Sequence, residues 1–229
     1  MLFDSTYIFV LIGALISMLA SMNVKSTYKK FSKVMSSKGY SAEQVADTIL
    51  RNAGIYDVKI ERVRGDLTDH YSPSEKVLRL SDTVYGSRSV AGIGVAAHEC
   101  GHAIQHNEDY TPLRLRSVAV PVANIGSKAS WPLILIGLLF GFMQLAQVGV
   151  LLFSLVVLVQ LITLPVEFDA SRRALNILGQ SNILEEEELS GAQKVLKAAA
   201  LTYVAALFST ILQLLRLVIL TSGGGRKRD

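Results

Sequence analysis

The stretch that decides the fold is His98-Glu99-Cys100-Gly101-His102-Ala103-Ile104-Gln105-His106. Its first five residues match the pattern His-Glu-x-x-His. In a helix, side chains four residues apart project from one face, so His98 and His102 would lie one turn apart. Two imidazoles in this arrangement can bind one tetrahedral Zn²⁺, and Glu99 can reach a water at the metal as a general base. The pattern therefore predicts a zinc-binding helix of the kind that zinc peptidases contain.

The alternative is a buried helix whose two histidines only make ordinary hydrogen bonds. The surroundings of the motif weigh against it, because residues 89–97 are small and apolar while three of the chain's four histidines fall within residues 98–106. We predict a helix from about Ser89 to Asn107. Cys100, the only cysteine, faces away from the two histidines and is interpreted as a packing residue, the alternatives being a thiol ligand or a redox switch. One cysteine permits no intramolecular disulfide, which fits a reducing compartment.

The composition indicates a membrane protein. Of the 229 residues, 50% are hydrophobic and only 18% are charged, and the mean hydropathy is +0.38. The net charge of +4 is modest, and no basic stripe is interleaved with aromatic residues. We therefore expect no nucleic-acid partner.

A first membrane span is predicted at residues 7–22, which form a continuous apolar run. No basic residue precedes the run and no signal-peptidase-like site follows it, so it is interpreted as a retained anchor. Five lysines come after it and place that side of the span in the cytoplasm: Lys25, Lys29, Lys30, Lys33 and Lys38. A basic amphipathic helix on the membrane surface is an alternative use of the same lysines.

Two further spans are predicted within residues 129–166, which contain no charged residue. As one helix this segment would measure roughly 57 Å, almost twice the hydrocarbon thickness, so we expect a hairpin that turns near residues 141–149. Residues 198–221 form a last apolar segment, and a basic tail follows at 223–228. Four spans would place this tail outside, against its three positive charges. Either the lysines after the first span determine the orientation of the chain, which we favour, or the last segment lies in the membrane interface or re-enters the membrane.

A small soluble region is predicted before the motif. Residues 41–53 have the pattern of an amphipathic helix with a capping box, residues 58–63 that of a strand, and residues 70–80 that of a β-hairpin. An edge strand beside a zinc site can hold an extended peptide by strand addition. His70 lies on this hairpin and is a candidate for stabilising the oxyanion or supporting a ligand, the alternative being an ordinary strand histidine.

A catalytic zinc usually has three protein ligands and one open position. His106 lies about 12 Å along a straight helix from His98, too far to share one ion. No helical context positions the acids Asp69, Glu108 and Asp109. Glu167 follows the long uncharged segment, where an ionisable group is a functional candidate. We expect a helix that starts at Glu167 to cross the motif helix; the alternative is a carboxylate that merely stabilises a helix N-terminus.

The chain resembles the YugP-type neutral zinc metallopeptidases of bacterial membranes over nearly its whole length. The likeness is carried by Asp69-His70-Tyr71, by Leu78-Arg79-Leu80-Ser81, by residues 95–105 around the motif and by residues 167–174. More distantly it is similar to the HtpX and CAAX-prenyl-protease group of membrane zinc endopeptidases. The resemblance implies that His98, His102 and Glu167 are zinc ligands and that Glu99 is the general base.

One position departs from the distant group. Ser171 stands where those enzymes have an aspartate that orients a zinc histidine, so the support of the histidines must be built differently here. A hydroxyl can still make one hydrogen bond. For the oxyanion, His70, Tyr71, Arg172 and Arg173 all remain candidates.

We therefore expect a mainly α integral membrane protein with about four transmembrane helices and a small α+β zincin-like region that holds a short β-hairpin and the HExxH helix. The expected parts are an anchor (1–24), a catalytic region (25–128), a transmembrane hairpin (129–166), helices carrying the third ligand (167–197), and a last span with a basic tail (198–229).

The expected activity is that of a zinc-dependent endopeptidase with one Zn²⁺. Its partners would be a protein or peptide substrate and the lipid bilayer. Its location would be the bacterial plasma membrane, with the active site on the cytoplasmic side. The alternative function is a catalytically silent zinc-binding scaffold or chaperone.

Overall fold

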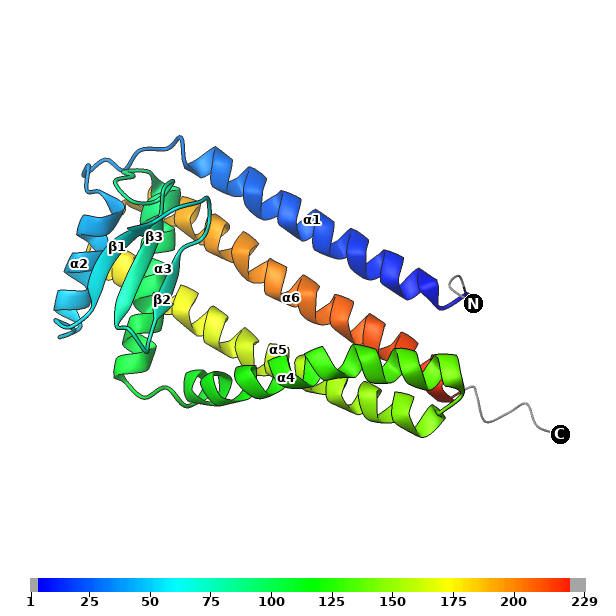
Figure 1. Ribbon diagram of the computed structural model, residues 1–229. Helices are drawn as coiled ribbons and strands as arrows, with labels where there is room; N and C mark the ends of the chain where they lie inside the picture. Colours follow the sequence, from blue (N-terminus) through cyan, green and yellow to red (C-terminus); the bar gives the residue numbers. More distant parts are fainter. Residues whose placement is uncertain (1–3, 223–229) are drawn as a thin grey trace. The chain divides into compact units, whose positions relative to one another are not determined.

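The computed structural model describes residues 4–222, so the predicted basic tail at 223–228 lies outside the described residues. Within that range the chain forms six helices and one three-stranded sheet (Figure 1). In chain order these are α1 (Tyr7–Phe31), α2 (Ala42–Asn52), β1 (Lys59–Val63), β2 (His70–Ser72), β3 (Val77–Ser81), α3 (Val90–Asn107), α4 (Thr111–Phe140), α5 (Met143–Gln180) and α6 (Glu186–Ser222). The expected fold class, mainly helical with a small sheet, is confirmed.

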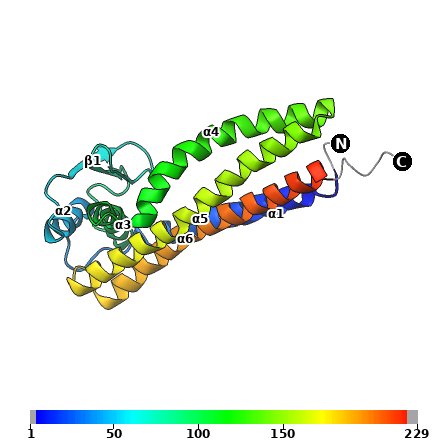
Figure 2. The same ribbon diagram turned by 90° about the horizontal axis from the view of Figure 1, so that it is seen from below.

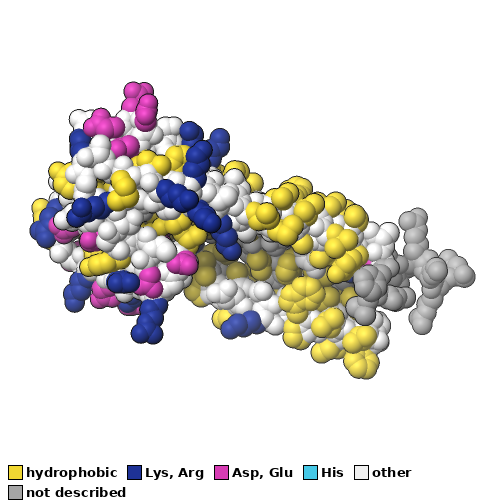
Figure 3. Space-filling model, turned by 90° about the horizontal axis from the view of Figure 1, so that it is seen from above, with side chains coloured by type: hydrophobic (Ala, Val, Ile, Leu, Met, Phe, Trp, Pro, Cys, Tyr) yellow, Lys and Arg dark blue, Asp and Glu magenta, His cyan; other side chains and the backbone are white. Residues whose placement is uncertain are grey.

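The chain divides into two compact units. Of the described residues, the helical unit comprises 4–21, 115–164 and 202–222, and the sheet unit comprises 22–114 and 165–201. Charged side chains gather over the elements of the sheet unit, whereas apolar side chains cover the helical unit (Figure 3).

Among the helices of the described range 4–222, four are long and apolar enough to cross a membrane: α1, α4, α5 and α6. Large apolar side chains of the helical unit are exposed, for example Leu139 at 78% and Ile125 at 72%. Lipid, unlike water, imposes no penalty on such exposure, so these surfaces fit a bilayer environment. The expectation of about four transmembrane helices is thus confirmed by helix length and composition.

The predicted hairpin is formed by α4 and α5, which turn at Gly141 and Phe142. Gly141 has a φ of 78°, the left-handed conformation in which glycine commonly ends a helix. The two helices then pack closely, because a Cβ at Gly137 would lie 2.5 Å from the backbone nitrogen of Ala146.

The helices are longer than the sequence suggested, and the expectation that a helix starts at Glu167 is wrong. Glu167 lies inside α5, which continues through Pro165. A proline removes one backbone N–H, but neighbouring groups in a membrane helix compensate for this loss, so the helix persists. In the same way α1, α4 and α6 each run through a predicted boundary between parts. The division into five parts stays a prediction.

The sheet has the strand order β1-β3-β2, so β2 is an edge strand. β2 and β3 are antiparallel, with His70 opposite Arg79 and Tyr71 opposite Leu78, which confirms the predicted hairpin. The strand predicted at 58–63 is β1, and it pairs in parallel with β3. Leu78 and Leu80 of β3 are fully buried in the core that this central strand shares with α2 and α3.

Helix α3 begins and ends almost where the motif predicted. Ser89 caps it by accepting a hydrogen bond from the Gly92 backbone at 3.1 Å. Seen nearly end-on in Figure 2, α3 lies beside α2. Where α3 meets α5, a Cβ at Gly101 would lie only 2.6 Å from the carbonyl oxygen of Ala170. Glycine therefore lets the two backbones approach closely, three residues from Glu167.

Candidate metal centre

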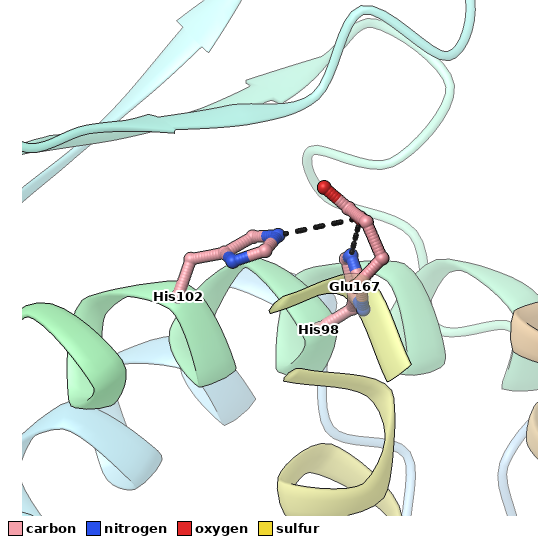
Figure 4. A group of neighbouring side chains, drawn as sticks. All are labelled: His98, His102 and Glu167. Atoms are coloured by element: carbon pink, nitrogen blue, oxygen red, sulfur yellow. Dashed lines mark ion pairs between the residues drawn. The ribbon is translucent and has the colours of Figure 1, made fainter. Parts of the chain in front are cut away.

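Three side chains from two helices converge on one point in the sheet unit. His98 and His102 project from the same face of α3, and Glu167 reaches them from α5 (Figure 4). Glu167 Oε2 lies 3.4 Å from His98 Nε2 and 3.6 Å from His102 Nε2. One potential ligand atom from each residue lies within 4.8 Å of the others. Glu167 therefore lies close to the two histidines, as the prediction of a third ligand requires.

The two separations between Glu167 Oε2 and the imidazole nitrogens fit a tetrahedral zinc ion. Zinc–ligand bonds of about 2.0–2.2 Å in tetrahedral geometry place neighbouring ligand atoms roughly 3.3–3.6 Å apart. The Glu167 side chain is only 3% exposed, and a buried carboxylate is stable when a cation or hydrogen-bond donors compensate its charge. Two imidazole nitrogens and one carboxylate oxygen are also a common donor set for catalytic zinc. The residues present thus fit the metal.

The orientation of His102 is fixed by Gln105, one turn further along α3. His102 Nδ1 lies 3.0 Å from Gln105 Oε1, and Gln105 Nε2 donates at 2.9 Å both to the Val166 carbonyl and to Asp169 Oδ2. Because both amide hydrogens are used in this way, the amide oxygen is the acceptor for His102. Nδ1 of His102 therefore carries a proton, and Nε2 faces Glu167.

His98 is supported by a different residue. Its Nδ1 lies 3.1 Å from the hydroxyl of Ser171. Ser171 is the position where the distant group has an aspartate, and the single hydrogen bond expected of a hydroxyl is present here. The ring of His98 therefore also turns Nε2 towards Glu167.

Glu99 lies beside this group and contacts the sheet. The residue is 7% exposed, and its Oε2 accepts a hydrogen bond at 3.0 Å from the backbone N–H of Tyr71 on β2. Strand β2 thus holds the Glu99 carboxylate in place directly after His98. The Glu99 carboxylate, which can accept a proton, therefore lies next to the candidate metal ligands and beside the edge strand β2.

The electrostatic environment differs between His102 and Cys100, two titratable groups of α3. Burial lowers the pKa of His102, but its hydrogen bond to Glu167 and the charges of Glu99 and Glu167 outweigh this effect and raise the pKa above the usual value. Burial raises the pKa of the Cys100 thiol well above its usual range, and its Sγ lies 3.6 Å from the Ala46 carbonyl. Cys100 thus has the surroundings of a packing residue.

The other sequence candidates lie outside this group. His70 is exposed, with Nδ1 at 2.9 Å from the Thr68 carbonyl. His106 Nδ1 lies 2.8 Å from the Tyr71 hydroxyl, one turn beyond His102 on α3. Among the acids, Asp69 accepts two hydrogen bonds from Ser81, at 2.7 Å from its backbone N–H and 2.8 Å from its hydroxyl.

The two arginines considered for the oxyanion both contact Asp169. Arg173 donates to Asp169 Oδ2 at 2.6 Å and to Glu108 Oε2 at 2.6 Å, and Arg172 donates to Asp169 Oδ1. Asp169 thereby links these arginines to Gln105. Sequence reasoning missed Gln105 and the indirect role of Asp169; the available signal was that Gln105 follows His102 by three residues, on the same side of a helix.

Comparison with known proteins gives the family. Residues 6–222 match the family described as "Putative neutral zinc metallopeptidase", and the chain belongs to this family of zinc metallopeptidases. It is 48% identical over 219 residues to the "Putative membrane protease YugP" of Bacillus subtilis (strain 168), covering 95% of this chain and 97% of that protein. No solved structure matches the chain significantly. The family implies Zn²⁺ as the cofactor, in agreement with the geometry of His98, His102 and Glu167.

Proposed function

We propose that the protein is a membrane zinc endopeptidase of the HExxH-glutamate type, with His98, His102 and Glu167 as the ligands of one zinc ion. The observation that carries the proposal is the buried Glu167 carboxylate, whose Oε2 faces two imidazole Nε2 atoms at 3.4 and 3.6 Å. Both imidazoles are oriented through Nδ1, by Ser171 and by Gln105. Such orientation is typical of metal-binding histidines.

The remaining side chains have distinct roles in peptide hydrolysis. When bound, zinc polarises the scissile carbonyl and lowers the pKa of a water molecule. Glu99 accepts the proton of the attacking water on a carboxylate oxygen and passes it to the leaving amine. The Tyr71 N–H holds this carboxylate in place at 3.0 Å before the proton is transferred.

The proposed substrate is an extended segment of protein or peptide. Strand β2 is at the edge of the sheet and lies next to α3, so an extended substrate segment can add beside it through edge groups other than the Tyr71 N–H, which donates to Glu99. Such pairing is independent of substrate sequence and of chain ends, which suits an endopeptidase. His70 lies exposed on the same strand and is the proposed residue for stabilising the oxyanion.

We further propose that the protein is a multi-pass protein of the bacterial plasma membrane with its site on the cytoplasmic side. The lysines that follow the first apolar run support this orientation, since positively charged segments next to a span remain in the cytoplasm.

The decisive experiment compares the wild type with Glu99→Gln, using detergent-purified protein, its zinc content and the cleavage of an unfolded protein such as casein. The variant should keep its zinc and lose cleavage by roughly 100-fold or more, because the general base is removed while the ligands remain. Glu61→Gln, an exposed change on β1, serves as the matched control. Wild type and Glu99→Gln with equal activity in cells and equal zinc content would instead favour the zinc-binding scaffold or chaperone.

A further inference from the structure

A shallow groove in the sheet unit lies between the C-terminal part of α1 and the N-terminal part of α6. Its volume is about 300 Å³, and α1 contributes Asn23, Thr27, Lys30 and Phe31 to its lining. Helix α6 contributes Lys194, Lys197, Ala198 and Leu201. The groove is made by different residues from the metal centre.

Three lysines line this groove, and the ammonium groups of two of them share one aromatic ring. Lys30 Nζ lies 5.6 Å and Lys194 Nζ 5.9 Å from the centroid of Phe31. The ring itself packs against Gly191, where a Cβ would lie 2.8 Å from Phe31 Cδ1. Cation–π attraction to a fixed ring therefore holds two positive charges close together.

Within residues 4–222, these positive charges form no ion pair with an acidic side chain. Among the ion pairs formed within residues 4–222, none includes Lys30, Lys194 or Lys197, whereas Lys38 lies 4.0 Å from Glu185. Like charges in proximity repel one another, and an anion bound among them removes the repulsion. The groove thus has the charge and the polar groups, in Asn23 and Thr27, to hold an anion.

The sequence places the groove at the water-facing end of two spans. In α1 the apolar run at 7–22 ends immediately before Asn23, and in α6 the apolar run at 198–221 begins immediately after Lys197. Both helices change from apolar to basic at the groove. At this level of a bilayer lie the phosphates of the lipid headgroups, and Ala198 and Leu201 supply an apolar wall.

We propose that this groove is a binding site for a phosphate anion, held by Lys30, Lys194 and Lys197. The same chemistry is offered by the headgroup of an anionic phospholipid and by free inorganic phosphate. The proposal is independent of the catalytic activity, because none of the lining residues contacts the metal centre.

The test is native mass spectrometry of the full chain in dodecyl maltoside micelles, titrated with phosphatidylglycerol, with phosphatidylcholine and with inorganic phosphate. The groove variant is Lys30→Gln/Lys194→Gln/Lys197→Gln. The matched control, Lys25→Gln/Lys29→Gln/Lys33→Gln, removes the same charge from exposed positions that do not line the groove. Circular dichroism and zinc content check the fold of each variant, and Lys→Arg at the three groove positions should preserve binding.

The expected result is that the groove variant binds phosphatidylglycerol at least about tenfold more weakly than the control variant, with little binding of phosphatidylcholine by any form. Inorganic phosphate that binds the wild type and control, but not the groove variant, would also support the site and identify free phosphate as its ligand. Equal losses in the groove and control variants would overturn the proposal, because general attraction to anionic lipid would then explain the binding. So would a groove variant that binds every probe as the wild type does.

Discussion

The side-chain oxygen of Gln105 accepts a hydrogen bond from Nδ1 of His102 at 3.0 Å, and Gln105 in turn donates to Asp169 at 2.9 Å. The amide is fully buried. It connects a carboxylate on α5 to a histidine on α3, where the two side chains are not in direct contact. Through this relay, Asp169 acts on His102 without facing it.

Replacing Gln105 by Leu should weaken zinc binding by roughly 10–100-fold, because His102 loses the acceptor that fixes its tautomer. The measurement is the zinc dissociation constant, obtained by competition with a chromophoric chelator, on protein whose helicity is unchanged. Gln193→Leu, an exposed glutamine on α6, should leave the affinity at the wild-type value. An unchanged affinity in folded Gln105→Leu would show that the relay does not support the ligand.

Ser171 offers a second test of how the histidines are supported. Ser171→Ala removes the hydroxyl that lies 3.1 Å from His98 Nδ1, at a cost of about 1 kcal/mol, which is roughly a fivefold loss of zinc affinity. Ser171→Asp introduces a charged acceptor at the same place and should bind zinc at least as tightly as the wild type. The same chelator competition measures both variants. An alanine variant with higher affinity than the aspartate variant would contradict this account.

The sequence was sufficient to predict the motif helix, the hairpin and the convergence of His98, His102 and Glu167 as a geometry. Each depends on local signals: a four-residue spacing, a turn at Pro73-Ser74, and an acid after a long uncharged segment. The helix ends were less predictable. A change from apolar to charged composition looks like an element boundary, but backbone hydrogen bonding in a helix is indifferent to it, so α5 continues through Glu167.

Contacts between distant segments were outside the reach of local patterns. The parallel pairing of β1 with β3 joins residues 59–63 to residues 77–81, and nothing in either strand specifies this partner. The Gln105–Asp169 contact likewise depends on the crossing of α3 and α5. That crossing is set by Gly101 and Ala170, two small residues that appear unremarkable in a sequence.

The closeness of that crossing makes Gly101 sensitive to substitution. In Gly101→Ala the new methyl group would lie 2.6 Å from the Ala170 carbonyl oxygen and 3.0 Å from its Cα, so the two helices must separate. Such overpacking costs about 1–3 kcal/mol of folding free energy and moves Glu167 away from the histidines. We expect a lower thermal midpoint together with weaker zinc binding.

Gly94→Ala is the matched comparison for this effect. Its new methyl group would meet the Ala192 side chain at 3.2 Å rather than a backbone oxygen, so a small shift suffices. Gly94→Ala should therefore lower the thermal midpoint less than Gly101→Ala and leave zinc affinity near the wild-type value. Equal zinc affinities in Gly101→Ala and Gly94→Ala would mean that the crossing distance does not control the site.

The ligand set itself is tested by zinc stoichiometry on folded, detergent-purified His102→Ala and Glu167→Ala, with His106→Ala as the control. A wild type that carries one zinc per chain should lose it in both ligand variants, because a two-ligand site that remains holds the ion far more weakly. His106 contacts Tyr71 at 2.8 Å and is no member of the group, so its variant should keep the metal. Zinc that is lost in His102→Ala but kept in Glu167→Ala would remove Glu167 from the ligand set. If zinc were then lost in His106→Ala, that histidine would be the third ligand. The helical separation of about 12 Å between His106 and His98 argues against this outcome, because it is about three times the distance that one ion can bridge.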